Sequence, residues 1–524
     1  MNIAEDKHIK KSAVKTFKLL LACLIVFAVS YYYLSYYRNY LYGLFADEGY
    51  IMYGAKRILE GQILYKDFFQ FYPPGDFYLL ALIFKLFGYG FTVARETTII
   101  IQSLITSIYF YLGYKAIKSW HVILLPFFII RISFLNFMQY SHYWSSMLFL
   151  FIALALFLQY LEQNKNLYLY LTGFFIGITG LFLQTTGAYA ALLFLLVFIL
   201  ERIKEQDFKR HLILFLIGIS VPLVVAFGYI AYQGALWDFI KEQYFISRVY
   251  GSWGTLNPLL LYFKNVGPIS LIFLLYVITA ILSFIVLIIQ KNNLSSQTKI
   301  ILMGNIILFF NTVTRIDYLH ILINASMAFV VIVVVLKWII GSTSRVSKNL
   351  YKLLQYGFGA VFAFFIIWGI ISMGTEVHSI NKSAYHINIY GIRVWTFSSK
   401  QAYNISEFFP QVEKHLHGDK NVFVYPYCPL VYVLFHFNNP TFTDLIPTIM
   451  DIPNYGTYSF NSVVQFLLRK KTDYVVYCDV PGNYIKDVTI LKAGRYRTNV
   501  LDEYISNSYT PVLRVNDLIL YKKK

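Results

Sequence analysis

The stretch DEGYIMYGAKRILEGQILYKDFFQFYPPG, residues 47–75, places several acidic side chains directly after a long apolar run. The whole chain is 58% hydrophobic and only 14% charged, whereas soluble globular proteins carry roughly 25% charged residues. Apolar runs of about 17–25 residues, the length that crosses a bilayer as a helix, recur between residues 17 and 373. We therefore expect a polytopic α-helical membrane protein, in which residues 47–75 belong to the first loop outside the bilayer.

Loop charges orient the expected helices, because short loops rich in Lys and Arg tend to stay in the cytoplasm. Such loops alternate with less basic ones when the N-terminus is placed inside. The basic N-terminal stretch runs into the first apolar segment without a small-residue cleavage site, so we expect an uncleaved first helix. A count of about eleven spans then leaves the C-terminus outside the plasma membrane. The expected spans are residues 17–38, 91–114, 121–138, 143–160, 167–183, 186–201, 211–232, 268–290, 299–314, 319–338 and 352–373.

The chain carries a cationic excess, with 45 Lys and Arg against 27 Asp and Glu. These cations fall in short loops and tails, which is the placement that membrane topology demands. No segment interleaves basic and aromatic residues in the manner of a nucleic-acid surface. We expect membrane lipids as the surroundings of this protein and no nucleic acid as a partner.

The tail, residues 375–524, differs in character from residues 1–374. Its short alternating or apolar runs are typical of strands, and two longer segments are typical of helices. We expect a transmembrane domain over residues 1–374 and an extracytoplasmic α/β domain over residues 375–524. Cys428 and Cys478 lie in this tail, and two cysteines alone leave open whether they pair. The expected strands are 422–425, 431–435, 473–477 and 518–521, and the expected helices are 400–416 and 460–471.

Residues 48–60 of the first outer loop have the period of a short amphipathic helix lying along the membrane surface. Asp47 then has two interpretations. Its carboxylate caps this helix, with Glu48 as a favourable first-turn acid, or both acids serve chemistry. Pro73-Pro74 makes the backbone before a second apolar helix extended. A rigid re-entry of this kind would hold Asp67 near Asp47 at the membrane surface.

Residues 47–75 resemble the first periplasmic loop of the GT-C superfamily, which comprises polytopic glycosyltransferases that use polyprenyl-phosphate sugars. The acid pair, the Tyr-x-Asp that ends at Asp67 and the Pro-Pro-Gly at these spacings carry the likeness. It is sharpest over residues 44–90 and extends more weakly through the membrane half and into the tail. The bacterial branch related to protein O-mannosyltransferase and to lipid A aminoarabinose transferase is the most similar.

The resemblance implies that Asp47 is the catalytic acid, that Glu48 accompanies it and that Asp67 is the second acid of the loop. In the aminoarabinose-transferase type, an acid and a lysine directly precede Pro-Pro, and the acid helps to hold a metal. Here those two positions are Phe71 and Tyr72. This departure leaves a divalent metal open as a cofactor, and Tyr72 becomes a candidate substrate-binding residue.

The segment TRIDYLH, residues 314–320, carries Arg315, Asp317 and His320 at the start of a late span. Arg315 is a candidate for holding the lipid-linked phosphate, because a guanidinium grips phosphate in a bidentate manner. The alternative is structural, with Arg315 and Asp317 paired or capping the helix and His320 satisfied inside the bundle. Further candidate residues for substrate or phosphate on the outer face are His142, Gln184, Arg248 and Lys264.

These residues together predict a glycosyltransferase that moves a sugar from a polyprenyl-phosphate donor to a hydroxyl of a glycan, lipid or protein. Asp47 would deprotonate the acceptor, and the cations would stabilise the leaving phosphate. Two other functions stay open at this point. A transporter or flippase of lipid-linked sugars would place charges near the bilayer midplane, and a glycan polymerase or ligase would carry its key residues in a large loop between late spans.

Overall fold

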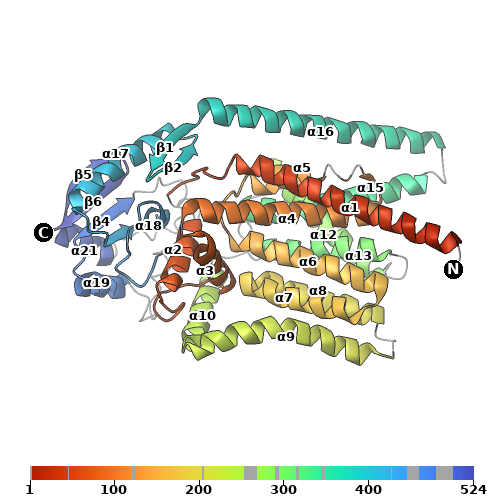
Figure 1. Ribbon diagram of the computed structural model, residues 1–524, viewed down its shortest axis with the longest axis horizontal. Coiled ribbons are helices and arrows are strands. Elements are labelled where there is room, and N and C mark those ends of the chain that lie inside the picture. Colours follow the sequence, from red (N-terminus) through yellow and green to blue (C-terminus); the bar gives the residue numbers. More distant parts are fainter. Residues whose placement is uncertain are drawn as a thin grey trace.

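The computed structural model describes residues 3–44, 47–120, 122, 125–202, 206–252, 268–289, 294–313, 318–343, 348–426, 428–444, 460–478 and 500–524. Long helices run side by side through most of the molecule, and the C-terminal strands and helices gather at one end of this bundle (Figure 1). Two shorter helices, α2 (Glu48–Leu59) and α3 (Gly75–Phe87), lie between the bundle and the C-terminal part.

The bundle helices occupy the segments expected to span the membrane. Among the described residues, four helical stretches are long and apolar enough to cross a bilayer, namely 14–35, 142–163, 208–232 and 272–289, and the chain is an integral membrane protein. Helices α3 and α4 pass the same test only as a pair bent by 116°, so α3 turns away from the axis of α4. The bundle consists of α1 (Ile3–Ser35), α4 (Phe91–Ile117), α6 (His142–Gln163), α7 (Asn166–Phe182), α8 (Gln184–Arg202), α9 (Phe208–Tyr232), α12 (Pro268–Ile289), α13 (Ser296–Val313), α15 (Ser326–Thr343) and α16 (Lys348–Ser383).

Two expected spans are interrupted in the structure. Residues 121–138 contain the short helix α5 (Leu125–Phe128) and a π-helical turn, η2 (Ile129–Phe134), instead of one continuous helix. Residues 319–338 divide into α14 (Tyr318–Asn324) and α15. The exact number of spans stays a prediction.

Close backbone approach joins α7 and α9. A Cβ added to Gly173 would lie 2.3 Å from the carbonyl oxygen of Phe215, and one added to Gly218 would lie 2.3 Å from the carbonyl oxygen of Tyr170. Only glycine permits this contact, which is the small-residue packing typical of helices in lipid.

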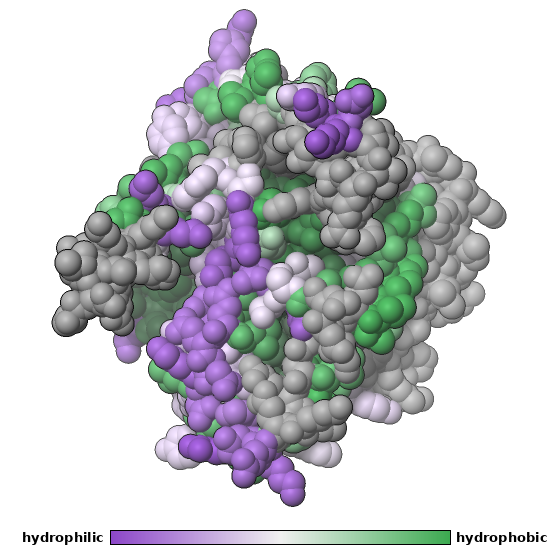
Figure 2. All heavy atoms as spheres, turned by 90° about the vertical axis from the view of Figure 1, so that its right-hand side faces the viewer, coloured by the Kyte–Doolittle hydropathy of each residue, from purple (hydrophilic) through white to green (hydrophobic). Residues whose placement is uncertain are grey.

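The far end of the bundle, opposite the C-terminal part, is shown in Figure 2. Hydrophilic side chains form a band across this end, and hydrophobic side chains flank it. Lys115, in the last turn of α4, forms an ion pair of 2.8 Å with Glu162, in the last turn of α6. Charge at the helix ends beside apolar flanks suits an end of the bundle that faces water.

The described residues of the C-terminal part form two small sheets. A hairpin of β1 (Tyr385–Ile389) and β2 (Ile392–Thr396) follows α16, and the second sheet has four strands in the order β3-β4-β6-β5. Strands β3 and β4 are parallel, and the other pairs are antiparallel. The four strands are β3 (Val422–Tyr425), β4 (Tyr474–Cys478), β5 (Tyr509–Val515) and β6 (Leu518–Lys523), and the helices of this part are α17 (Ser399–Leu416), α18 (Leu430–Leu434), α19 (Phe460–Arg469) and α21 (Val500–Ser508).

One expected strand is wrong. Residues 431–435 were expected to be a strand, but they lie almost entirely in the short helix α18. All five residues of α18 are buried, and an apolar run that is buried on every side has no period to separate strand from helix. Pro429 occupies the N-cap position and starts the turn. Helix α16 also runs through the expected domain boundary at residue 374 and ends at Ser383.

Candidate functional site

The site is built around the start of α2, where the two adjacent acids lie. Asp47 occupies the N-cap position with φ −57° and ψ −27°, yet its side chain makes no capping hydrogen bond. An N-cap residue normally has extended φ and ψ, which turn its side chain toward the first backbone N–H groups. The capping interpretation of Asp47 is therefore wrong. Its side chain is partly buried in the structure.

Glu48 has a different environment, although it is the next residue. Its side chain is fully buried, and Oε1 lies 2.5 Å from Nη2 of Arg95 on α4. Oε2 accepts a hydrogen bond of 3.1 Å from the backbone N–H of Tyr140. Burial raises the pKa of the Glu48 carboxyl, while Arg95 and the Tyr140 N–H oppose that rise. Glu48 thus anchors α2 to α4 and to the turn before α6.

An aromatic and histidine row, formed by Tyr50, Tyr72, His142, Tyr143 and His320, crosses the same end of the bundle. The rings of Tyr50 and Tyr72 stack 5.5 Å apart at an angle of 3°. Tyr72 lies 4.3 Å from the ring of His142, which lies 4.2 Å from that of Tyr143. The Tyr143 hydroxyl is hydrogen-bonded to Nε2 of His320. The row links the Pro-Pro loop to α6 and α14, and it unites three of the predicted site residues.

Helix α10 (Leu236–Ser252) closes another side of the Pro-Pro loop. Gln184 donates a hydrogen bond of 3.0 Å to the side-chain oxygen of Gln243, and Gln243 donates one of 2.9 Å to the carbonyl oxygen of Phe71. The carboxylate of Glu242 accepts a hydrogen bond of 3.2 Å from the backbone N–H of Gln70. Gln184 is therefore linked to the Pro-Pro loop by way of Gln243 on α10.

The predicted cations fall largely beyond what the structure describes. The backbone of Arg248 continues α10, and its side chain lies outside the described atoms. Lys264, Arg315 and Asp317 lie outside the described residues. His320 is described, and it is the third residue of helix α14. These residues stay predictions for the site.

Asp67 bonds within its own segment of the loop, and its place near Asp47 stays a prediction. It is exposed, and its Oδ2 accepts a hydrogen bond of 2.6 Å from the backbone N–H of Ile63. This is the local bonding of an acid that closes a turn. The structure thus gives Asp67 a role in shaping the loop.

Asp76 belongs to the same surroundings, and sequence analysis did not single it out. It lies in the first turn of α3, is 2% exposed, and its Oδ1 accepts a hydrogen bond of 2.8 Å from the Ser145 hydroxyl on α6. Burial raises the pKa of the Asp76 carboxyl to about 7, with Ser145 and Tyr140 opposing the rise. The available signal was an acid directly after Pro-Pro-Gly at the start of an apolar helix.

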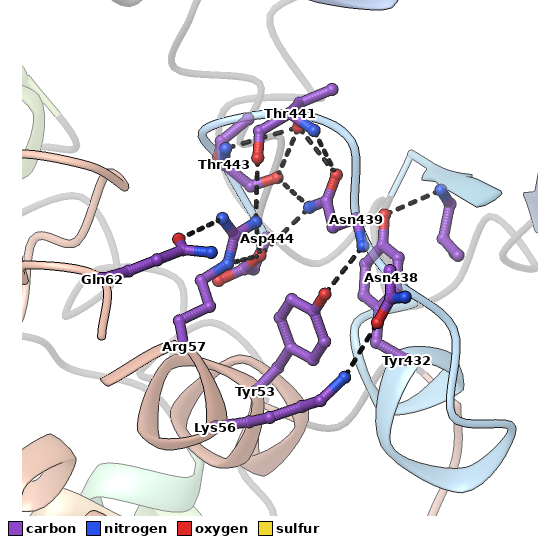
Figure 3. Close-up of polar contacts among 11 residues, drawn as sticks. Tyr53, Lys56, Arg57, Gln62, Tyr432, Asn438, Asn439, Thr441, Thr443 and Asp444 are labelled. Carbon is purple, nitrogen blue, oxygen red and sulfur yellow. Dashed lines mark hydrogen bonds and ion pairs between the residues drawn. The ribbon is translucent and has the colours of Figure 1, made fainter. Parts of the chain in front are cut away.

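Side chains of α2 contact loops of the C-terminal part (Figure 3). Arg57 on α2 forms a buried ion pair of 2.6 Å with Asp444. The Tyr53 hydroxyl accepts a hydrogen bond of 2.7 Å from the backbone N–H of Asn439, and the ring of Tyr53 stacks 4.8 Å from that of Tyr432. Helix α2 is therefore held between the bundle and a roof formed by the C-terminal part.

No group of three or more His, Cys, Asp or Glu side chains that could hold a metal is found among the described residues. Phe71 and Tyr72, which precede Pro-Pro, are packed against each other with ring centroids 4.4 Å apart. Aromatic side chains of this kind do not coordinate divalent ions as carboxylates do.

Comparison with known proteins rests on structure, since no family model and no curated protein matches the chain. The oligosaccharyltransferase of Archaeoglobus fulgidus, solved with Zn and sulfate, superposes with a TM-score of 0.52 at 13% identity, over 88% of this chain and 69% of that one. The same enzyme tethered to an acceptor peptide with the NVT sequon gives 0.51 at 12%, over 96% and 74%. ArnT from Cupriavidus metallidurans bound to undecaprenyl phosphate gives 0.48 at 12%, over 97% of both chains.

The chain therefore has the fold of GT-C glycosyltransferases, as the residues of the first outer loop had indicated. At this low identity the likeness establishes the architecture.

Proposed function

We propose that this protein is a membrane glycosyltransferase that transfers a sugar from a polyprenyl-phosphate carrier to the hydroxyl of a glycan, lipid or protein acceptor. The reaction takes place at the outer face of the plasma membrane, with the N-terminus inside and the C-terminal part outside. The observation that supports this proposal is the different bonding of two adjacent acids. Glu48 is buried and engaged by Arg95, whereas Asp47 makes no capping hydrogen bond at the end of a firmly held helix.

Asp47 acts as the general base. Its carboxylate accepts the proton of the acceptor hydroxyl while the acceptor oxygen bonds to the anomeric carbon, and the bond between that carbon and the phosphate oxygen breaks. Attack opposite the leaving group inverts the anomeric centre. Glu48 is a positioning residue, because its ion pair and its bond to the Tyr140 N–H fix the first turn of α2.

The leaving polyprenyl phosphate gains negative charge in the transition state, and cations placed nearby stabilise that charge. Arg315 is the first candidate for this role, and Arg248 and Lys264 are further ones. His320 lies five residues after Arg315 in the sequence, and its Nε2 is hydrogen-bonded to the Tyr143 hydroxyl; both side chains can hydrogen-bond phosphate or sugar oxygens. His142 and Tyr72, whose rings lie 4.3 Å apart in the aromatic and histidine row, are further candidates for contact with the sugar.

The test uses membranes that contain wild-type protein, Asp47→Asn or Glu60→Gln, with a panel of radiolabelled polyprenyl-phosphate sugars and a membrane extract as acceptor source. Glu60 is a matched control, since it is an exposed acid at the other end of α2. We expect wild type and Glu60→Gln to release label from one donor, and Asp47→Asn to release none while reaching the membrane at the same level. Full release by Asp47→Asn would refute the assignment of the base.

A further inference from the structure

Two cysteines of the C-terminal part meet in its core. Cys478 is the last residue of β4, and Tyr477 beside it pairs with Tyr425, the last residue of the parallel strand β3. Because parallel strands leave a sheet at the same edge, Cys428 and Cys478 emerge next to each other. Both are buried, with 4% and 2% of their surface exposed.

The contact between the two side chains is direct. Their sulfurs are present as thiols, and the two thiols are hydrogen-bonded to each other. Two buried thiols that are hydrogen-bonded to each other are placed for oxidation to a disulfide bond. The third cysteine, Cys23, lies in the first span and takes no part in this cluster.

We propose that Cys428 and Cys478 form a disulfide bond in the mature protein. The proposal rests on the orientation given above, in which the C-terminal part lies outside the plasma membrane, because disulfides persist in oxidising compartments. The oxidant is an extracytoplasmic dithiol–disulfide oxidoreductase. One thiolate of this chain attacks the disulfide of that protein and expels one of its thiolates, and the second thiolate of this chain then attacks the mixed disulfide. Two electrons and two protons pass to the oxidoreductase.

The timing of this step follows from burial. Burial raises the pKa of the Cys428 thiol well above its ordinary value, and the thiolate is the reactive species. Thiol–disulfide exchange therefore takes place before the C-terminal part has folded, while both thiols are still accessible. Once the domain has closed, reducing agents reach the bond only when the domain unfolds.

The bridge would strengthen the roof over α2. Cys428 precedes Pro429 and Leu430, and the backbone N–H of Leu430 donates a hydrogen bond of 3.3 Å to the carbonyl oxygen of Leu44. A Cβ added to Gly49 would lie 2.3 Å from the nitrogen of Leu430. The cross-link thus ties the end of β4 to the segment that lies directly against the start of α2.

The cysteine count makes the test simple. Cells are lysed directly into denaturant that contains maleimide–polyethylene glycol, which adds a fixed mass per free thiol, either without reduction or after treatment with a reducing agent. We expect one adduct, on Cys23, without prior reduction and three adducts after reduction. Cys23→Ser should give none without reduction and two after it. Three adducts on unreduced, denatured wild type would overturn the proposal.

A second measurement identifies the bonded pair. Mass spectrometry of a non-reduced digest is expected to contain a peptide pair joined through Cys428 and Cys478. A joined peptide that includes Cys23, or single adducts without the joined pair, would also overturn the assignment. Neither readout uses transferase activity, so a failure here is distinguishable from a failure of the proposed reaction.

Discussion

The ion pair between Arg57 and Asp444 should hold the C-terminal part on α2, and its removal gives the sharpest prediction. Both side chains are almost fully buried, at 4% and 0% exposure. Arg57 donates two hydrogen bonds to Oδ1 of Asp444, of 2.6 and 3.0 Å, and one of 2.9 Å to the carbonyl oxygen of Thr441. Asn439 donates a further one of 3.0 Å to the same Oδ1. Figure 3 shows this network closing over α2.

Arg57→Met removes the cation and leaves the Asp444 carboxyl buried with Asn439 as its remaining donor in this network. Loss of one partner of a buried pair costs about 3–5 kcal/mol of stability, and burial this complete leaves little solvent screening to reduce the value. The double variant Arg57→Met/Asp444→Leu also removes the stranded charge. It should therefore lose less than the sum of the two single variants, by roughly 2 kcal/mol or more.

The assay is equilibrium unfolding in detergent micelles, followed by tryptophan fluorescence and by protease cleavage of the C-terminal part. Lys420→Met is the matched control, because its ion pair with Glu413 is about one-third exposed on each side and is worth about 0–1 kcal/mol. The deficit of Arg57→Met should grow as the pH rises above the ordinary pKa of an Asp carboxyl, because burial raises the pKa of Asp444 and the unpaired carboxylate destabilises the fold as it ionises. A cost no larger than that of Lys420→Met, or strictly additive variants, would refute the reasoning.

Two further predictions concern packing and protonation near the site. Gly49→Ala should destabilise the protein by about 1–3 kcal/mol, because its Cβ would collide with the Leu430 backbone. Gly228→Ala is the control, since nothing lies within 4 Å of a Cβ at that position, and it should be neutral or slightly stabilising in the same unfolding assay. Equal effects of the two substitutions would contradict the contact between Gly49 and Leu430. The pKa of the Asp76 carboxyl is raised from 3.8 to about 7 in the folded protein, so the folded state holds this proton more tightly than the unfolded state. Stability should therefore fall by roughly 4 kcal/mol as the pH rises from 4 to 7. Asp76→Asn should flatten the decline of stability over that window, and an unchanged slope would show that Asp76 titrates normally.

Local elements were predictable from the sequence because their signals are local. Helix α2 was expected over residues 48–60 and spans Glu48–Leu59. Its apolar period lies within this segment, and Gly61, with φ +87°, follows directly as the residue that ends the helix. The helices expected at 400–416 and 460–471 were found for the same reason. Where the local signal was ambiguous, as in residues 431–435, prediction failed.

The candidate site could be predicted only in part. The sequence identified Asp47, Glu48, Tyr72, His142 and His320 as candidates, and the structure brings the last three into one row of contacts. It did not distinguish the roles of the adjacent acids, which depend on partners far away in the chain. The position of Asp76, directly after Pro-Pro-Gly at the start of an apolar helix, was visible in the sequence, but it did not show that the side chain is buried against α6.

The amino-acid sequence by itself determined that this protein is a bundle of membrane helices with an acid-bearing first loop, because hydrophobic length and period are properties of a continuous segment. The tertiary structure decided the partners of Glu48. Arg95 lies 47 residues beyond Glu48 and the Tyr140 N–H 92 residues beyond it, so both contacts exist only once α2, α4 and α6 have packed together. Burial within that packing separates the environments of Asp47 and Glu48, which share almost the same place in the chain.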